Sequence, residues 1–139
     1  MPDKHPAVIA SERSAQFAMA KDKASWLALF ADDAFLADPV GKSMLDPEGA
    51  GHQGKAAIER FWDTVIANAN LTLVASQRIA CHDTCVAVLQ ATNEMGGGIK
   101  TVVDMVGLYQ VNDEGKLQSL KVYWDFGKLM AQLKALGIG

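Results

Sequence analysis

The carboxylate of Asp38 is the group in this sequence best suited to moving a proton. Asp38 ends a short apolar segment, 34–38, and precedes Pro39-Val40-Gly41, so we expect it where apolar side chains converge. A carboxylate in such surroundings has a raised pKa, which suits general base catalysis. An aspartate before proline also commonly initiates a turn, so the local sequence leaves both roles open.

The two cysteines are the other candidates for chemistry. They bracket Cys81-His82-Asp83-Thr84-Cys85, a cluster of potential metal ligands at a predicted turn. Structural zinc sites usually draw on four ligands, often as two separated pairs, and this sequence has no second Cys or His pair. We therefore favour two ordinary thiols and no metal, with a metal site or an oxidised cross-strand disulfide as the alternatives.

The composition indicates one folded domain, residues 1–139, with apolar surface to spare. Half of the 139 residues are hydrophobic and only 21% are charged, which is more apolar than a disordered chain. A chain of this length buries roughly two-thirds of its surface on folding. The remaining apolar residues predict both a ligand cavity and a subunit interface.

Charge and hydropathy exclude two classes of partner. The 13 basic residues are scattered along the chain and are outnumbered by 16 acidic ones, so no surface for a phosphate backbone is indicated. No apolar run approaches the roughly 18 residues that span a bilayer, and the first residues do not resemble a signal peptide. We expect a cytoplasmic protein that contacts neither nucleic acid nor membrane.

Helices and loops occupy the first half of the predicted architecture. The Ala-rich segment 7–20 and the segment 23–30, behind the N-cap residue Asp22, predict two helices. A strand over 34–38 comes next, followed by a loop over 42–54 that contains Pro47 and three glycines and is long enough to act as a lid. Apolar side chains at helical spacing then predict a helix over 55–69 that lies against a sheet.

Long strands dominate the second half. Segments 71–81, 84–95, 99–111 and 116–125 are rich in Val, Leu, Thr and aromatic residues and are separated by turn signals, which predicts antiparallel hairpins in series. A last helix is expected over 126–137. The fold class is therefore α+β, with helices on one face of a curved antiparallel sheet, an arrangement that leaves a hollow for a small ligand.

Short motifs occur in a characteristic order along the chain. These are Ala31-Asp32-Asp33-Ala34 with Asp38-Pro39-Val40-Gly41, Gly54-Lys55-Ala56-Ala57-Ile58, Phe61-Trp62, Lys100-Thr101-Val102-Val103, Gly115-Lys116-Leu117 and Tyr123-Trp124. In these motifs the chain resembles the bacterial ketosteroid isomerases (steroid delta-isomerases) of the nuclear transport factor 2-like, or SnoaL-like, superfamily, and the resemblance covers about residues 8–126. It implies a cone-shaped sheet wrapped by N-terminal helices, a deep apolar pocket, a homodimer and no cofactor.

The resemblance also implies a role for Asp38 and shows two departures from the family. It places Asp38 at the general base, which shuttles a proton while a Tyr and a protonated Asp stabilise the dienolate oxygen. At the positions that match these two donors the chain has Ser14 and Gly107. Losing one preorganised donor typically costs on the order of 3 kcal/mol, so isomerisation is expected to be slow unless other donors substitute.

Several residues are candidates for the remaining parts of the pocket. Tyr109 lies two residues beyond Gly107 and is expected on the same strand face, whereas Asp104 is expected on the opposite one. Met side chains adapt their shape to a large apolar ligand, so five of them are expected to fill the core or the pocket wall: Met19, Met44, Met95, Met105 and Met130. The candidate ligand-binding residues are Ser14, Trp62, Met105, Gly107, Tyr109 and Trp124, each aromatic also being a candidate for simple core packing.

Three functions fit this reading. The first is an isomerase in which Asp38 moves a proton next to a carbonyl of a steroid-like substrate. The second is a non-catalytic protein that binds steroids or other hydrophobic small molecules. The third is related chemistry on the same fold, such as polyketide cyclisation, dehydration or epoxide hydrolysis, the last of which would require an Asp-Arg-Asp set in the pocket. Fold alone does not decide among them.

Overall fold

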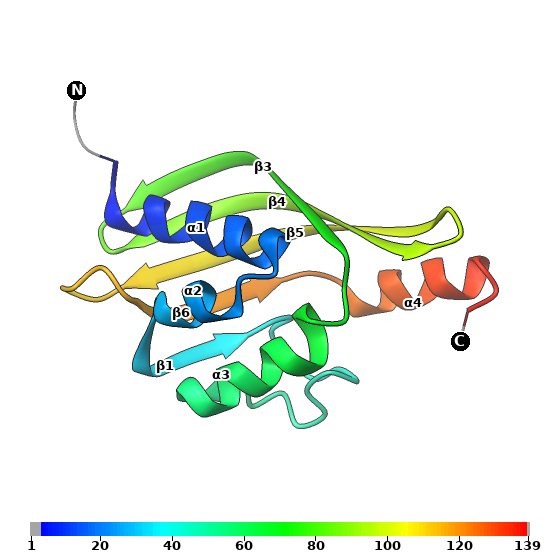
Figure 1. Ribbon diagram of the computed structural model, residues 1–139, viewed down its shortest axis with the longest axis horizontal. Helices are drawn as coiled ribbons and strands as arrows, with labels where there is room; N and C mark the ends of the chain where they lie inside the picture. The colour runs from blue at the N-terminus through cyan, green and yellow to red at the C-terminus, as the bar shows by residue number, and fades with distance from the viewer. Residues whose placement is uncertain (1–3, 139) are drawn as a thin grey trace.

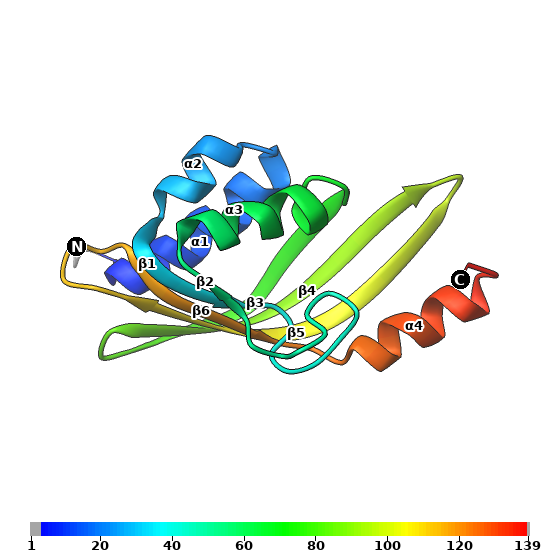
Figure 2. The same cartoon turned by 90° about the horizontal axis from the view of Figure 1, so that it is seen from below.

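The computed structural model describes residues 4–138, in which one curved sheet carries three helices on its concave side (Figures 1 and 2). The helical segments are α1 (Pro6–Ala20), α2 (Lys23–Ala28), α3 (Lys55–Phe61), a π-helical turn (Trp62–Ile66) and α4 (Phe126–Ala135). The strands are β1 (Phe30–Ala37), β2 (His52–Gln53), β3 (Leu71–Cys81), β4 (Thr84–Gly96), β5 (Ile99–Val111) and β6 (Leu117–Tyr123). The predicted α+β class is confirmed, and so is the element order apart from β2, which lies in the segment predicted as a loop.

Local sequence explains where the first helices begin and end. His5 caps α1 by accepting a hydrogen bond at Nδ1 from the Ala7 amide, 3.0 Å away, and proline occupies the first helical position. Lys21 ends α1 in a left-handed conformation, with φ of 58°. Asp22 then caps α2 through the amide of Ser25 at 3.2 Å, as its position before the helix predicted.

The sheet has six strands in the order β2-β1-β6-β5-β4-β3. The strands from β3 to β6 form antiparallel hairpins in series, as predicted, but β1 pairs with β6 in parallel, so the sheet is mixed. No hairpin joins β1 to β6, and therefore nothing in the local sequence requires them to run in opposite directions. β1 also begins four residues earlier than predicted, because the polar pair Asp32-Asp33 interrupts the apolar pattern from which a strand is predicted.

The core lies between the three helices and the inner face of the sheet. Trp26 of α2 packs between Phe30 and Trp62, with ring centroids 4.7 and 5.1 Å away, and Ile58 of α3 is fully buried. The apolar stripe of the predicted helix over 55–69 therefore faces the sheet as expected. The second half of that helix is a π-helical turn, a feature frequent at functional sites.

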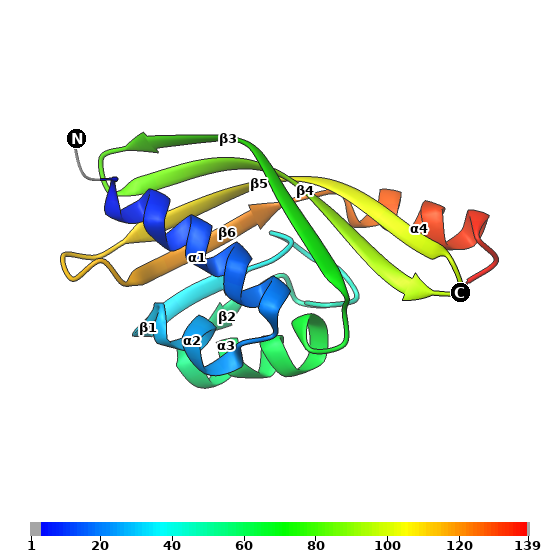
Figure 3. The ribbon, with the colours of Figure 1, turned by 45° about the horizontal axis from the view of Figure 1, so that its top comes forward.

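The far ends of β4 and β5 extend beyond these helices, and α4 lies beside them (Figures 2 and 3). β6 pairs with β5 only from Val106 to Val111, which leaves the β5 edge before Val106 without a strand neighbour. Gln132 of α4 occupies that edge: its side chain accepts from the Val102 amide at 2.8 Å and donates to the Val102 carbonyl at 2.6 Å. α4 is thereby held against the sheet, although none of its side chains is fully buried.

Candidate functional site

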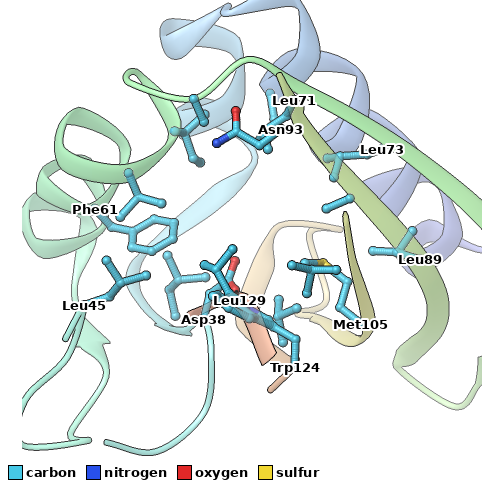
Figure 4. Close-up of a pocket in the computed structure, with 18 of the residues that line it drawn as sticks. Asp38, Leu45, Phe61, Leu71, Leu73, Leu89, Asn93, Met105, Trp124 and Leu129 are labelled. Carbon is cyan, nitrogen blue, oxygen red and sulfur yellow. Dashed lines mark hydrogen bonds between the residues drawn. The ribbon is translucent and has the colours of Figure 1, made fainter. Parts of the chain in front are cut away.

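A cavity of about 470 Å³ opens between the inner face of the sheet, the helices and α4 (Figure 4). Its walls are mainly apolar, with contributions from Leu36, Phe61, Leu73, Leu89 and Met105. The curvature of the sheet keeps the wall of β4 and β5 away from α3, which is why side chains do not fill the space. The predicted apolar pocket is therefore present.

Asp38 stands at one end of this cavity, one residue after β1 ends. Trp124, which follows β6, donates a hydrogen bond from its indole Nε1 to Oδ1 of Asp38 at 2.6 Å. Burial raises the pKa of Asp38 to about 6, and the hydrogen bond from Trp124 acts in the opposite direction. The carboxylate is half-buried, because water can reach it through the cavity while protein surrounds its other sides.

Tyr109 places a buried phenol in the cavity wall. Burial raises the pKa of Tyr109 to about 12, mainly through desolvation; a side-chain hydrogen bond with Ser11 and the charge of Arg78 oppose the rise, and the charge of Asp38 adds to it. Tyr109 is therefore a neutral hydrogen-bond donor at physiological pH. Arg78 reaches the same region by donating from Nε to Ser11 Oγ at 3.0 Å.

The ring of Tyr109 lies directly over Gly107. A Cβ added at Gly107 would stand 2.7 Å from Cε1 and 3.2 Å from the hydroxyl oxygen of Tyr109. The phenol thus occupies the space that a side chain at 107 would fill, and Gly107 itself does not line the cavity. Glycine at 107 therefore leaves room for the ring of Tyr109, and the phenol hydroxyl that donates at this point comes from two residues farther along β5.

The other sequence-predicted residues divide between the cavity and its surroundings. Ser14, Met105 and Trp124 line the cavity, and Ser14 lies one helical turn from Ser11 on α1. Trp62 does not: it is buried on Trp26, and the adjacent Phe61 supplies the aromatic wall instead. Asp38, Ser14, Met105, Tyr109 and Trp124 are therefore brought together, whereas Trp62 and Gly107 stand behind the wall.

The predicted lid contributes two apolar residues to the cavity. Met44 and Leu45 line it, and Met44 is 77% exposed. Of the other methionines, Met105 and Met130 line the cavity as expected, whereas Met19 and Met95 are exposed at 40% and 45%, so the expectation of core or wall positions is wrong for both.

Two groups of cavity residues were not predicted from the sequence. Phe126 and Leu129 of α4 line the cavity, as do four polar residues, Thr64, Asn68, Asn93 and Thr101. Alternation along β4 could have found Asn93, because it is two residues from Ala91 and four from Leu89, which both face inward. The positions of Asn68 and of α4 depend on tertiary packing that periodicity does not report.

The remaining candidates lie away from the cavity. Asp104 is exposed and accepts a hydrogen bond from Gln90 at 3.1 Å, so the strand-face prediction for it is confirmed. Cys81 is exposed and Cys85 is buried, and both are free thiols. Within residues 4–138, no three His, Cys, Asp or Glu side chains are grouped as metal ligands. Over the same range, no helix combines the length and apolar character needed to cross a bilayer.

The geometry supplies the parts of a proton-transfer site. A carboxylate with a pKa of about 6 is mostly ionised at neutral pH and can still hold a proton, which suits a base that later returns it. Tyr109 of β5 and Ser14 of α1 add hydroxyl donors to the cavity. An apolar ligand with a carbonyl could therefore meet a base and a neutral donor in one cavity.

Comparison with known proteins identifies a family model that matches this chain and a curated protein that is similar in sequence. Residues 12–120 match the model of the SnoaL-like domain. A steroid Delta-isomerase from Nocardioides simplex is 28% identical over 104 residues, which cover 74% of this chain and 76% of that protein.

Two solved structures are similar over most of both chains. RV0760c from Mycobacterium tuberculosis has a TM-score of 0.85 at 36% identity, covering 91% of this chain and 96% of that one, and was also solved in complex with estradiol-17beta-hemisuccinate. The Delta 5-3-ketosteroid isomerase from Mycobacterium sp. has a TM-score of 0.82 at 31% identity, covering 89% and 96%.

Proposed function

Because the chain belongs to the SnoaL-like family, in which it is related to steroid delta-isomerase, we propose that it is an isomerase of keto-steroids or of similar apolar ketones. The observation that carries the proposal is the half-buried Asp38 carboxylate, with its raised pKa and its hydrogen bond from Trp124, at the end of an apolar cavity. A ligand complex of RV0760c with a steroid supports the substrate class.

Asp38 acts as the base in this proposal. Its carboxylate takes a proton from the carbon between the ketone and a β,γ double bond, and the electron pair moves onto the ketone oxygen as a dienolate forms. The resulting carboxylic acid then returns the proton to the γ carbon, which leaves the conjugated ketone and restores the carboxylate. No metal or organic cofactor takes part in this sequence.

Tyr109 stabilises the dienolate oxygen by donating a hydrogen bond. Its pKa of about 12 keeps the phenol protonated, and its ring fills the space over Gly107. Ser14, across on α1, is the second donor in reach of the cavity. These hydroxyls replace the family's two acidic donors, and the site gains stabilisation without a second carboxyl group.

A non-catalytic steroid-binding protein is the second candidate. The observation that favours it is the absence of an acidic side chain at positions 14 and 107. Epoxide hydrolysis has less support, because none of Arg13, Arg60 and Arg78 lines the cavity, so an Asp-Arg-Asp set is not formed there.

The experiment that separates isomerase from binding protein is the Asp38→Asn variant. Steady-state conversion of a Δ5-3-ketosteroid is measured for wild type, Asp38→Asn and the control Asp32→Asn, whose side chain is fully exposed on β1. We expect Asp38→Asn to lose essentially all activity and to keep its affinity for the conjugated product, because the amide fills the same space without accepting the proton. Equal rates for wild type and Asp38→Asn would leave the binding protein as the better description.

A homodimer in the cytoplasm completes the proposal. Apolar side chains are exposed on the outer face of the sheet, which the helices leave uncovered, among them Val74, Val88, Val106 and Tyr123. A second copy of the chain would cover them.

A further inference from the structure

The cavity wall formed by β4 and β5 is polar at both ends and apolar between them. Along β5 the lining runs from Tyr109 through Met105 and Val103 to Thr101, and on β4 Asn93 is the direct cross-strand partner of Thr101. Figure 4 shows Asn93 across the cavity from Asp38 and Trp124. An apolar ligand that fills the cavity therefore reaches a second polar site.

The orientation of the Asn93 amide is fixed by its neighbour. Its Oδ1 accepts a hydrogen bond from the backbone amide of Asn70 at 2.8 Å. Because a backbone N–H can only donate, the atom facing Asn70 must be the carbonyl oxygen, and the NH₂ group is the other terminal atom. Within residues 4–138 that NH₂ group donates no hydrogen bond to another residue, so it is available to a ligand.

We infer that Asn93, with Thr101 beside it, binds an oxygen atom at the end of the substrate opposite the reacting ketone. The inference rests on the proposed function and adds a specificity-determining residue to it. The hydroxyl of Tyr109, which receives the ketone oxygen in the proposed function, lies over Gly107, and Gly107 is six residues from Thr101 on β5. At about 3.3 Å per residue the two polar sites are separated by at most roughly 20 Å along the strand.

That separation decides which ligands fit. Hydrogen bonds at both ends take up part of the separation, and a fused four-ring skeleton that carries an oxygen at each end fills the rest. A small cyclic ketone would reach only one of the two sites. The substrate class is therefore an elongated apolar ketone with a second ketone or hydroxyl at its far end.

Two ligands and two variants test the inference. The ligands are androstenedione, which has a ketone at each end, and its analogue with the far ketone reduced to CH₂. Asn93→Asp keeps an oxygen for the Asn70 amide but removes the NH₂ donor, and Asn93→Leu removes both. Thr92→Val, at the adjacent position facing away from the cavity, is the control. Dissociation constants are measured by calorimetry, and thermal melts show that each variant is folded.

We expect both Asn93 variants to weaken binding of the diketone about tenfold, the range of a lost hydrogen bond. The monoketone should change less than about twofold with Asn93→Asp and bind at least as well with Asn93→Leu. If an Asn93 variant changes both ligands by the same factor, or neither, the inference fails while the isomerase proposal stands. If wild type binds neither ligand, the steroid-like substrate class fails as well.

Discussion

The indole of Trp124 holds the carboxylate of Asp38, with Nε1 donating to Oδ1 at 2.6 Å. The two residues follow adjacent parallel strands, β1 and β6, so the parallel pairing brings the two strand ends to the same edge of the cavity. This contact has a chemical consequence, because burial raises the pKa of Asp38 and the indole lowers it again. Burial and the hydrogen bond from Trp124 therefore together determine the pH at which Asp38 ionises.

The pH profile of isomerisation should report this pair. Asp38 must be ionised to accept a proton, so kcat/KM is expected to rise with pH and to level off above a midpoint of about 6. Trp124→Phe removes the donor that stabilises the charged form, which should move the midpoint upward by about one pH unit. Tyr123→Phe, on the outer face, is the control and should leave the midpoint where it is. A midpoint that is the same in Trp124→Phe and wild type would contradict this role.

The same carboxylate should lower stability at neutral pH. Its pKa is about 6 in the fold against 3.8 for an ordinary aspartate, so between these values the native state binds more protons than the unfolded chain. The contribution of Asp38 to the free energy of unfolding is therefore fully present below about pH 4 and is lost as pH rises through about 6.

Asp38→Asn should remove that loss. The variant is expected to be more stable than wild type by up to about 3 kcal/mol at pH 8, with the difference vanishing near pH 4. Urea unfolding of both proteins across this range measures it, with Asp32→Asn expected to follow wild type. A difference that does not depend on pH would mean that Asp38 is not desolvated.

Tyr109 should matter for the rate and little for affinity. Tyr109→Phe keeps the ring and removes the donor, so kcat is expected to fall on the order of a hundredfold while the dissociation constant of an apolar product changes less than about threefold. Steady-state kinetics and product binding check both, and an unchanged kcat would leave Ser14 as the main donor. Gly107→Asp, which would restore the family's acid, should destabilise the fold instead, because its Cβ would stand 2.7 Å from the Tyr109 ring.

The strands and helices could be predicted because local pattern determines them. Alternation and turn residues located β3 to β6 within a few residues, and capping by Asp22 located the start of α2. The parallel pairing of β1 with β6 could not be found this way, since it depends on which strands meet in space. Likewise the start of β1 could not be predicted, because Asp32 and Asp33 are exposed polar residues of a kind typical of loops.

Site residues could be predicted where alternation along one strand determines which way the side chain faces. They could not be predicted where packing between different elements determines it. Asp38 follows an apolar strand and Tyr109 alternates with Met105, so both could be placed on the cavity wall. Trp62 and Phe61 are sequence neighbours, and only the packing of Trp62 on Trp26 settles which one lines the cavity. The contribution of α4 depends on Gln132, whose contact with Val102 spans 30 residues of chain.

That contact should govern access to the cavity. Gln132 makes two hydrogen bonds to the backbone of Val102, and α4 has no fully buried side chain to hold it otherwise. Gln132→Ala should therefore release α4, raise hydrogen exchange at the Val102 amide and weaken binding of an apolar product several-fold. Lys134→Ala, exposed in the last turn of α4, is the control. Unchanged exchange at Val102 would show that other contacts hold the helix.

Exposed apolar side chains on the outer face of the sheet predict that two copies of the chain form a dimer there. Val88, Val106 and Tyr123 are neighbours across β4, β5 and β6, and each is 37% to 45% exposed. α4 does not cover them, because its apolar residues Phe126 and Leu129 line the cavity on the opposite face.

A second copy packed on this face would bury an apolar stripe that water otherwise meets, and a twofold axis would pair the same residues of both copies. We expect wild type to sediment as a dimer at micromolar concentration. Val106→Lys should sediment as a monomer, because it would place two charges in the buried centre of the interface. Met95→Lys, at an exposed apolar site near the β4–β5 turn, should remain dimeric. A monomeric wild type, or a dimeric Val106→Lys, would mean that this face is not the interface.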